Sequence, residues 1–128
     1  MAAGIEAELL TLSQKLLTAI DSGDWATYAG LCDDSITCFE PEALGHLVAG
    51  LPFHKYYFDL PAGKSPKQST IASPHVRLLG DAAVVTYTRV VQKLDSQGSP
   101  VSAAAMETRI WQKTAAGWKH VHFHRSPQ

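Results

Sequence analysis

The chain has 128 residues, of which 45% are hydrophobic and 18% are charged, and its formal net charge is −1. A chain of this length can bury about two-thirds of its unfolded surface, so we expect one soluble domain, residues 1–128, around one hydrophobic core. The 11 Lys and Arg residues balance the 12 Asp and Glu residues without forming a run, which argues against nucleic acid or an anionic membrane as a partner.

The start of the chain carries Glu6 and Glu8 where a secretory signal needs an apolar stretch. No segment reaches the ~18 consecutive apolar residues of a membrane span. The two cysteines, Cys32 and Cys38, suggest neither a disulfide framework nor a zinc motif by number or spacing. We therefore expect buried, reduced thiols and a cytoplasmic location.

The first half of the chain predicts helices. Apolar residues recur at helical spacing along residues 4–21 and predict a long amphipathic helix. Asp24 is placed to cap a second, shorter helix, whose apolar face contains Trp25, Tyr28, Ala29 and Cys32. Residues 36–39 are β-prone and end in a turn at Pro41, and a short strand is expected to return at residues 46–48. A third helix then begins near Pro52 and closes before Pro61.

After a loop from Pro61 to Ser69, the apolar period changes to two. This period predicts strands at residues 75–79, 83–93, 101–113 and 118–125, separated by turn residues. Helices come first and strands last, which is typical of an α+β domain. We expect a curved antiparallel sheet with the first helix packed across it.

Three arginines lie on strand faces that alternation places beside apolar, aromatic or acidic residues. These neighbours are Val85, Tyr87 and Val91 for Arg89, Glu107 and Trp111 for Arg109, and Val121 and Phe123 for Arg125. A strand arginine usually reaches the rim or pairs with a carboxylate, and that alternative stays open. If the three converge inside the sheet, the buried charge requires Glu107, another acid or a bound anion such as a small carboxylate.

Other titratable residues carry weaker signals. His120, His122 and His124 alternate along one strand and would share a face, but no acidic or cysteine cluster accompanies them, so we expect no metal site. Glu40 and Glu42 flank Pro41 and are interpreted as solvated or capping acids of a turn. The chain has no phosphate loop, nucleophile elbow or zinc-binding helix motif, so we assign no catalytic residue and no cofactor.

Two runs carry a family resemblance. Residues 39–45, Phe-Glu-Pro-Glu-Ala-Leu-Gly, and residues 121–126, Val-His-Phe-His-Arg-Ser, closely resemble the association, or hub, domain of calcium/calmodulin-dependent protein kinase II. Shorter matches follow in the same order along nearly the whole chain: residues 22–24, 50–51, 53–54, 57–58, 74–75, 80–81 and 107–111.

The resemblance implies a cone-shaped fold of the nuclear transport factor-like type, with a long helix against a strongly curved sheet. It implies a non-catalytic oligomerisation scaffold, in which dimers stack into a ring of a dozen or more subunits. Partners would be copies of this chain, hub domains of related kinases and small carboxylates, while calmodulin binding belongs to the family's kinases. The carboxylate cavity would be lined by Arg89, Arg109, Arg125 and His54, with Glu107 as a neutralising acid.

Two departures from the animal kinases limit what the resemblance implies. The sequence contains no kinase domain, calmodulin-binding segment or regulatory region, so we expect either a stand-alone hub-like protein or a part of a longer one. Residues 61–67 form a shorter loop without the tryptophan of those kinases, so gating by that residue is not expected here.

The competing function is a small-molecule enzyme of the isomerase, dehydratase or polyketide-cyclase type, which the same fold hosts. An arginine-lined pocket without a base favours the scaffold.

Overall fold

The computed structural model describes residues 2–61 and 65–127. Its elements are, in chain order, α1 (Ala2–Ser22), α2 (Trp25–Leu31), β1 (Cys32–Phe39), the 3-10 turn η1 (Pro41–Ala43), β2 (Val48–Ala49), α3 (Pro52–Asp59), β3 (Gln68–Leu79), β4 (Ala82–Leu94), β5 (Pro100–Thr114) and β6 (Gly117–Arg125). Helices dominate the first half and long strands the second, as predicted, which confirms the α+β class.

Helix α1 forms because its apolar side chains repeat on one face, which packs against the sheet. Leu9, Leu16 and Leu17 on this face are fully buried. The helix ends at Ser22, and the next residue, Gly23, has a φ of +71°, a conformation that glycine adopts without a steric penalty. The Asp24 side chain then accepts a hydrogen bond from the Thr27 amide at 3.1 Å and caps α2, as the sequence predicts.

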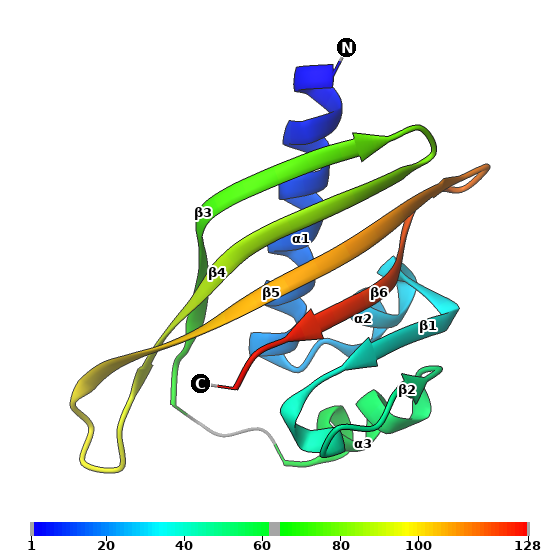
Figure 1. Cartoon of the computed structure of the whole chain (residues 1–128). Helices are drawn as coiled ribbons and strands as arrows, with labels where there is room; N and C mark the ends of the chain where they lie inside the picture. Colours follow the sequence, from blue (N-terminus) through cyan, green and yellow to red (C-terminus); the bar gives the residue numbers. More distant parts are fainter. Residues whose placement is uncertain (1, 62–64, 128) are drawn as a thin grey trace.

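The sheet has the strand order β2-β1-β6-β5-β4-β3. Consecutive strands from β3 to β6 form antiparallel pairs, and β1 pairs with β2 in the same way. One pair departs from the predicted antiparallel sheet, because β1 runs parallel to β6. The chain reaches this arrangement by placing β1 early and returning to it only with its last strand (Figure 1).

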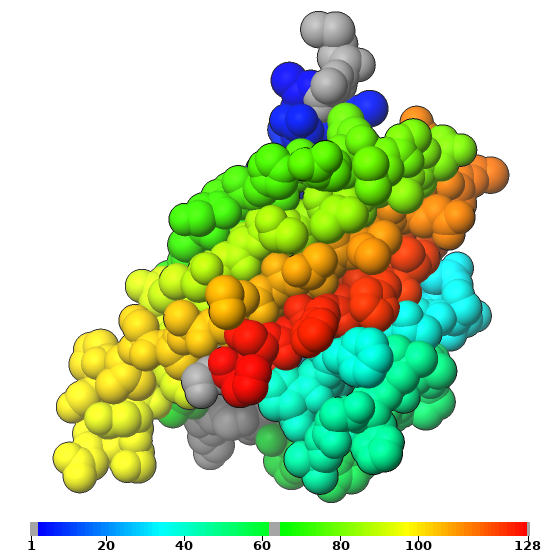
Figure 2. Space-filling model, viewed as in Figure 1, coloured from blue at the N-terminus to red at the C-terminus, as the bar shows by residue number. Residues whose placement is uncertain are grey.

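The molecule has two layers. In Figure 1, α1 crosses behind the sheet, and α2 and α3 lie near its lower end beside β1 and β2. The buried apolar side chains of α1, α2 and the inner sheet face form one core cluster. Figure 2 shows the opposite face of the sheet, where the strands themselves form the surface and no helix lies in front of them.

A β-bulge in β6 overturns the prediction that three histidines share a face. Trp111 pairs with His120 while Ile110 pairs with His122, so Val121 is the extra residue and the alternation reverses across it. His120 is therefore fully buried on the inner face. The side chains of His122 and His124 lie on the other side, where both rings contact Phe39. For the same reason Val121 does not continue the inner row of Phe123 and Arg125.

Three predicted boundaries differ from the structure. Cys32 does not extend the face of α2 but begins β1, which is longer than residues 36–39. The short returning strand is Val48–Ala49 rather than residues 46–48. Strand β3 begins at Gln68, inside the predicted loop, and its register shifts between Ala72 and His75, where Pro74 interrupts the strand pattern. The predicted loop includes residues 62–64, which lie outside the described residues.

Within residues 2–61 and 65–127, the structure has no helix that is both long enough and apolar enough to span a bilayer.

The packing of α1 predicts a large cost for truncating its buried face. We expect Leu16→Ala to lower the free energy of unfolding by about 2–5 kcal/mol, because Leu16 is 0% exposed and the substitution leaves a cavity. Thr11→Ala, on the exposed side of the same helix, should change it by less than about 0.5 kcal/mol. Urea denaturation at one protein concentration measures both. Equal losses in the two variants would contradict this packing.

Candidate functional site

A cavity of about 250 Å³ opens between the inner sheet face and the helices. Residues from α1, α2 and α3 form one wall, and strands β4, β5 and β6 form the other. Its lining is rich in charged side chains: Glu40, Glu42, His54, Lys67, Arg89, Lys93, Arg109 and Arg125. The apolar and aromatic part of the wall consists of Ile20, Tyr28, Tyr57, Phe58, Val91 and Phe123.

The innermost charged group is a pair formed by Arg109 and Glu107, which are two residues apart on the inner face of β5. Arg109 Nη2 donates to Glu107 Oε1 at 2.8 Å, and both side chains are almost completely buried. Tyr87 on β4 closes the unit, because its hydroxyl donates to Glu107 Oε1 at 2.6 Å and accepts from Arg109 Nε at 2.7 Å. Burial alone would raise the pKa of Glu107, but Arg109, the Tyr87 hydrogen bond and Arg89 hold that pKa below its ordinary value.

The rest of the Arg109 guanidinium is also occupied. Its Nη1 lies 3.3 Å from His120 Nε2, and its Cζ lies 4.7 Å from the centroid of the Phe123 ring. Since a guanidinium can only donate, His120 Nε2 must accept and Nδ1 carries the proton, 3.5 Å from Cys32 Sγ. Burial, and then Arg109, lower the pKa of His120 well below its ordinary range, so this imidazole is neutral.

Arg89 joins the sheet to the end of the first helix. Its Nη2 donates to Asp21 Oδ1 on α1 at 2.8 Å, and its Nε donates to Ser69 Oγ on β3 at 2.8 Å. The third donor, Nη1, faces Glu107 Oε2 at 3.6 Å. Arg89 therefore lies between two carboxylates and binds three segments together.

Arg125, at the end of β6, holds the acids of the η1 segment. Its Nη2 binds the Glu42 carboxylate and lies 3.6 Å from Glu40 Oε2. Burial would raise the pKa of Glu42, but the hydrogen bond from Arg125 holds it below its ordinary value. Burial, and then the negative charge of Glu42, raise the pKa of Glu40 above its ordinary value despite Arg125.

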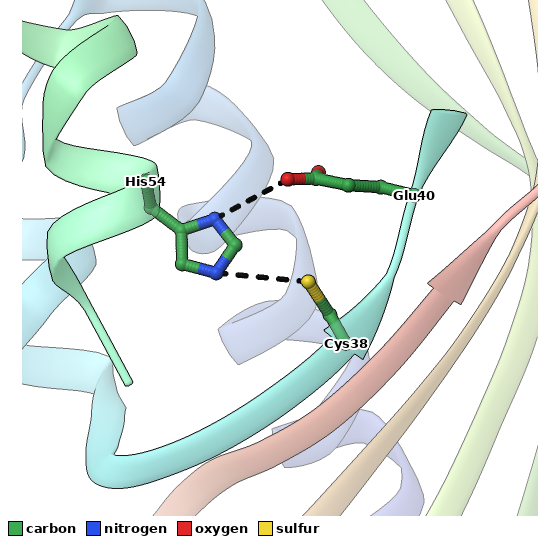
Figure 3. Close-up of side chains that lie close together, drawn as sticks. All are labelled: Cys38, Glu40 and His54. Carbon is green, nitrogen blue, oxygen red and sulfur yellow. Dashed lines mark hydrogen bonds and ion pairs between the residues drawn. The ribbon is translucent and has the colours of Figure 1, made fainter. Parts of the chain in front are cut away.

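His54 on α3 lies between Cys38 of β1 and Glu40, which directly follows that strand (Figure 3). Its Nδ1 is 3.7 Å from Glu40 Oε1, and its Nε2 is 3.7 Å from Cys38 Sγ. Burial and the nearby Arg109 lower the pKa of His54 to about 4, so the ring is neutral near pH 7. Both thiols are free and buried, and burial raises the pKa of Cys32 and of Cys38 to about 12.

The structure brings together the predicted residues Arg89, Arg109, Arg125 and His54 along one cavity. Glu107 lies behind this lining, where it binds Arg109 and faces Arg89. Strand alternation predicted the inward faces of Arg89, Arg109 and Glu107, but Lys93 of β4, which also lines the cavity, was not predicted. The position of Arg125 follows from the same rule, since the bulge lies before Phe123.

The sequence interpretation missed three acids. Glu40 and Glu42 were expected to be solvated or capping acids of a turn, but the Glu40 side chain is only 9% exposed and both carboxylates lie in the cavity wall. Asp21, at the end of α1, received no role and pairs with Arg89. The sequence indicates only that each inward arginine needs an acid as a partner. It does not indicate which acid that is.

The three arginines therefore have more acid partners than Glu107, the one acid named from the sequence as their neutralising group. Among the described residues, three guanidinium groups meet four carboxylates, those of Asp21, Glu40, Glu42 and Glu107. Lys67 and Lys93 add positive charge to the lining. Such a site can bind an anion if that anion replaces one of these acids at an arginine, and it also contains a carboxylate next to a neutral imidazole.

Comparison with known proteins identifies one family along nearly the whole chain. The family model described as "calcium/calmodulin dependent protein kinase II association domain" matches residues 5–128. Over 122 residues the chain is 47% identical to the calcium/calmodulin-dependent protein kinase type II alpha chain of Drosophila melanogaster, a match that covers 93% of this chain and 23% of the relative. The chain thus spans about a quarter of the length of the curated relatives it matches.

Solved structures agree. The hub homology domain from Chlamydomonas reinhardtii superposes with a TM-score of 0.91 at 52% identity, covering 97% of this chain and 98% of the other. The association domain from C. elegans gives a TM-score of 0.92 at 41% identity, with 98% and 97% covered. A nuclear transport factor 2-like protein from Salmonella enterica, 19% identical with a TM-score of 0.79 and with 98% and 92% covered, confirms the nuclear transport factor-like fold.

The buried pair predicts a pH-dependent stability. We expect Glu107→Gln to lower the free energy of unfolding by about 3–5 kcal/mol near neutral pH, because the substitution leaves Arg109 buried without its carboxylate. Because the folded pKa of Glu107 lies below its ordinary 4.5, the contribution is fully present above pH 4.5 and is lost as the pH falls through the folded pKa. The difference between wild type and variant should therefore shrink below pH 4.5.

Urea midpoints at one protein concentration from pH 7 downward measure this difference. Asp59→Asn is the control, since Asp59 forms an exposed pair with Lys55 and its loss should cost about 0–1 kcal/mol. A Glu107→Gln loss that is small at pH 7, or that stays constant into acid, would contradict the assignment.

Proposed function

The chain belongs to the association-domain family of calcium/calmodulin-dependent protein kinase II, and on this basis we propose that it is a non-catalytic oligomerisation scaffold. Copies of the chain form dimers, and the dimers stack into a closed ring of a dozen or more subunits. The observation that carries the proposal is the match over residues 5–128, with a hub homology domain covered over 98% of its length. Identities of 41–52% to other hubs support co-assembly with hub domains of related kinases.

Several large apolar side chains are exposed in the single chain, which supports their burial in contacts between subunits. Phe39, Leu44 and Leu47, which lie in β1 and the segment up to β2, are 37%, 85% and 54% exposed. Met106 on β5 is 67% exposed. The uncovered face of the sheet in Figure 2 offers a second broad surface. A ring of dimers needs two different interfaces, and apolar residues of this kind are typical of such contacts.

We further propose that the cavity binds a small carboxylate at its arginines. Arg125 is the best placed to contact it, because its side chain is 16% exposed and Arg109 donates all its hydrogen bonds to Glu107, Tyr87 and His120. Arg89 and Arg109 attract the anion by their positive charge. Glu107 offsets the charge of these two arginines inside the protein. His54 lines the same cavity as a neutral group. The bound carboxylate takes the place of Glu42 on Arg125.

One observation favours a second function, the small-molecule enzyme. Glu40 has a raised pKa and lies beside neutral His54 in the cavity, which is an arrangement that acid–base chemistry uses. A proposed dehydratase of the NTF2-like family from Streptomyces avermitilis shares the fold at 21% identity with a TM-score of 0.80, and that likeness extends to the fold alone. The scaffold is the stronger proposal because whole-chain matches at 41–52% identity are to hubs and association domains.

The scaffold predicts a large oligomer that an apolar-to-charged change disrupts. We expect the wild-type chain to elute as a closed assembly about an order of magnitude heavier than the monomer. Leu47→Asp should shift it to smaller species, because aspartate would be buried at an interface without a partner. Gln97→Asp, in the β4–β5 turn, should leave the assembly intact. Light scattering coupled to size exclusion measures all three, and a wild-type monomer or dimer at micromolar protein would refute the scaffold.

Carboxylate binding predicts opposite effects for two changes in the same ion pair. Glu42→Gln should tighten the binding of lactate or pyruvate by roughly tenfold, because the ligand no longer competes with the Glu42 charge for Arg125. Arg125→Lys should weaken it by roughly tenfold, since lysine keeps the charge but cannot form the bidentate bond. Calorimetric titration measures both, with exposed Lys55→Gln as the control. Unchanged or weaker binding in Glu42→Gln would show that Arg125 is not the contact.

A further inference from the structure

A sulfur, a carboxylate oxygen and an imidazole nitrogen lie together at the end of β1. Cys38 is in β1, Glu40 follows the strand directly, and His54 faces them from α3 (Figure 3). Taking one ligand atom from each residue, all three atoms lie within 4.8 Å of one another. These residues come from two segments of the chain, so the grouping is produced by the fold and not by sequence spacing.

This donor set is one that transition metals use. Thiolate, imidazole and carboxylate are the ordinary zinc ligands, whereas Mg²⁺ and Ca²⁺ prefer oxygen atoms alone. In a tetrahedral zinc site with bonds of about 2.0–2.3 Å, ligand atoms lie about 3.3–3.8 Å apart. The 3.7 Å between Cys38 Sγ and His54 Nε2 already meets this spacing. Glu40 Oε1 lies 3.7 Å from the other ring nitrogen, Nδ1, so its carboxylate has to move toward Nε2 to bind the same ion.

We propose that Cys38, Glu40 and His54 bind one Zn²⁺ ion with a fourth coordination position open to the cavity. Cys38 is fully buried at the back of the cluster, while Glu40 and His54 line the cavity. The open position is therefore directed toward the cavity, where water or a small anion completes the shell. Binding replaces the Sγ–H bond of Cys38 with an Sγ–Zn bond, and the displaced proton leaves to solvent.

The surroundings hold the His54 ring in place and leave one Glu40 carboxylate oxygen for the ion. Arg125 Nη2 lies 3.6 Å from Glu40 Oε2, which leaves the other carboxylate oxygen for the ion. The His54 ring packs against Tyr28 and Phe123, with centroid distances of 6.0 and 5.6 Å. Such contacts restrict ligand orientation before the metal arrives. Glu42 on the neighbouring turn offsets the positive charge of Arg125.

The test uses Co²⁺ as a spectroscopic probe and then Zn²⁺ in competition with a chromophoric chelator, on the 128-residue chain. We expect one ion per chain, thiolate-to-Co²⁺ charge-transfer absorption, loss of that absorption on adding Zn²⁺, and release of one proton. Cys38→Ser should abolish the absorption. Glu40→Gln should lower the affinity for Zn²⁺ by at least about 100-fold, because loss of a ligand should cost at least as much as the largest losses seen for residues that only contact the ligands.

Two control variants are matched to the ligands. Cys32→Ser removes the other buried thiol, which lies near His120 and not in the cluster, and should leave binding unchanged. His124→Gln removes an exposed histidine outside the cluster and should also have no effect.

Absence of thiolate charge transfer in the wild-type chain would overturn the proposal, and so would binding that survives Cys38→Ser or is lost in His124→Gln. The wild-type spectrum decides the question even if a variant fails to fold. Light scattering on the same samples reports assembly separately, so failure of the metal site and failure of the scaffold are distinguishable.

Discussion

The buried pair of Arg109 and Glu107 is the interaction on which the interior of this domain depends. A guanidinium does not lose its proton, so its place under the sheet requires a carboxylate of equal burial. Glu107 supplies it at 2.8 Å, and Tyr87 binds both partners. The pair then fixes the surroundings of Arg109, including the tautomer of His120. The innermost charged group is thus formed by residues of β5 and of the neighbouring strand β4 alone.

The other two arginines extend this principle from the sheet to segments far away in the chain. Arg89 binds Asp21 at the end of α1, and Arg125 binds Glu42 in the turn after β1. Each ion pair ties a helix or turn to the sheet, and the arginine of each pair also lines the cavity. Because Arg89, Arg109 and Arg125 each already have a carboxylate partner, ligand binding becomes an exchange of one anion for another. This is also why the cavity contains acids that a carboxylate-binding pocket would not otherwise need.

Sequence reasoning succeeded where one local rule decides the structure. Helical spacing predicted α1, and alternation predicted the inward faces of Arg89 and Arg109, because both rules depend on neighbouring residues alone. It failed at the bulge after His120, since one extra residue in β6 reverses the face and has no clear sequence signal. It also failed for Asp21, Glu40 and the Cys38–His54 contact, because these depend on how distant segments pack. The proline at 41 suggested a solvated turn, whereas the structure folds that turn onto Arg125.

A double-mutant cycle on Glu107→Gln and Arg109→Met tests the central claim most directly, because it isolates the coupling between the two charges from the packing of either side chain. If the pair is the compensated unit described here, the double variant should lose about 1–3 kcal/mol less unfolding free energy than the sum of the two single variants. Losses that add to within about 0.5 kcal/mol would mean that the two charges do not depend on each other, and would contradict the account.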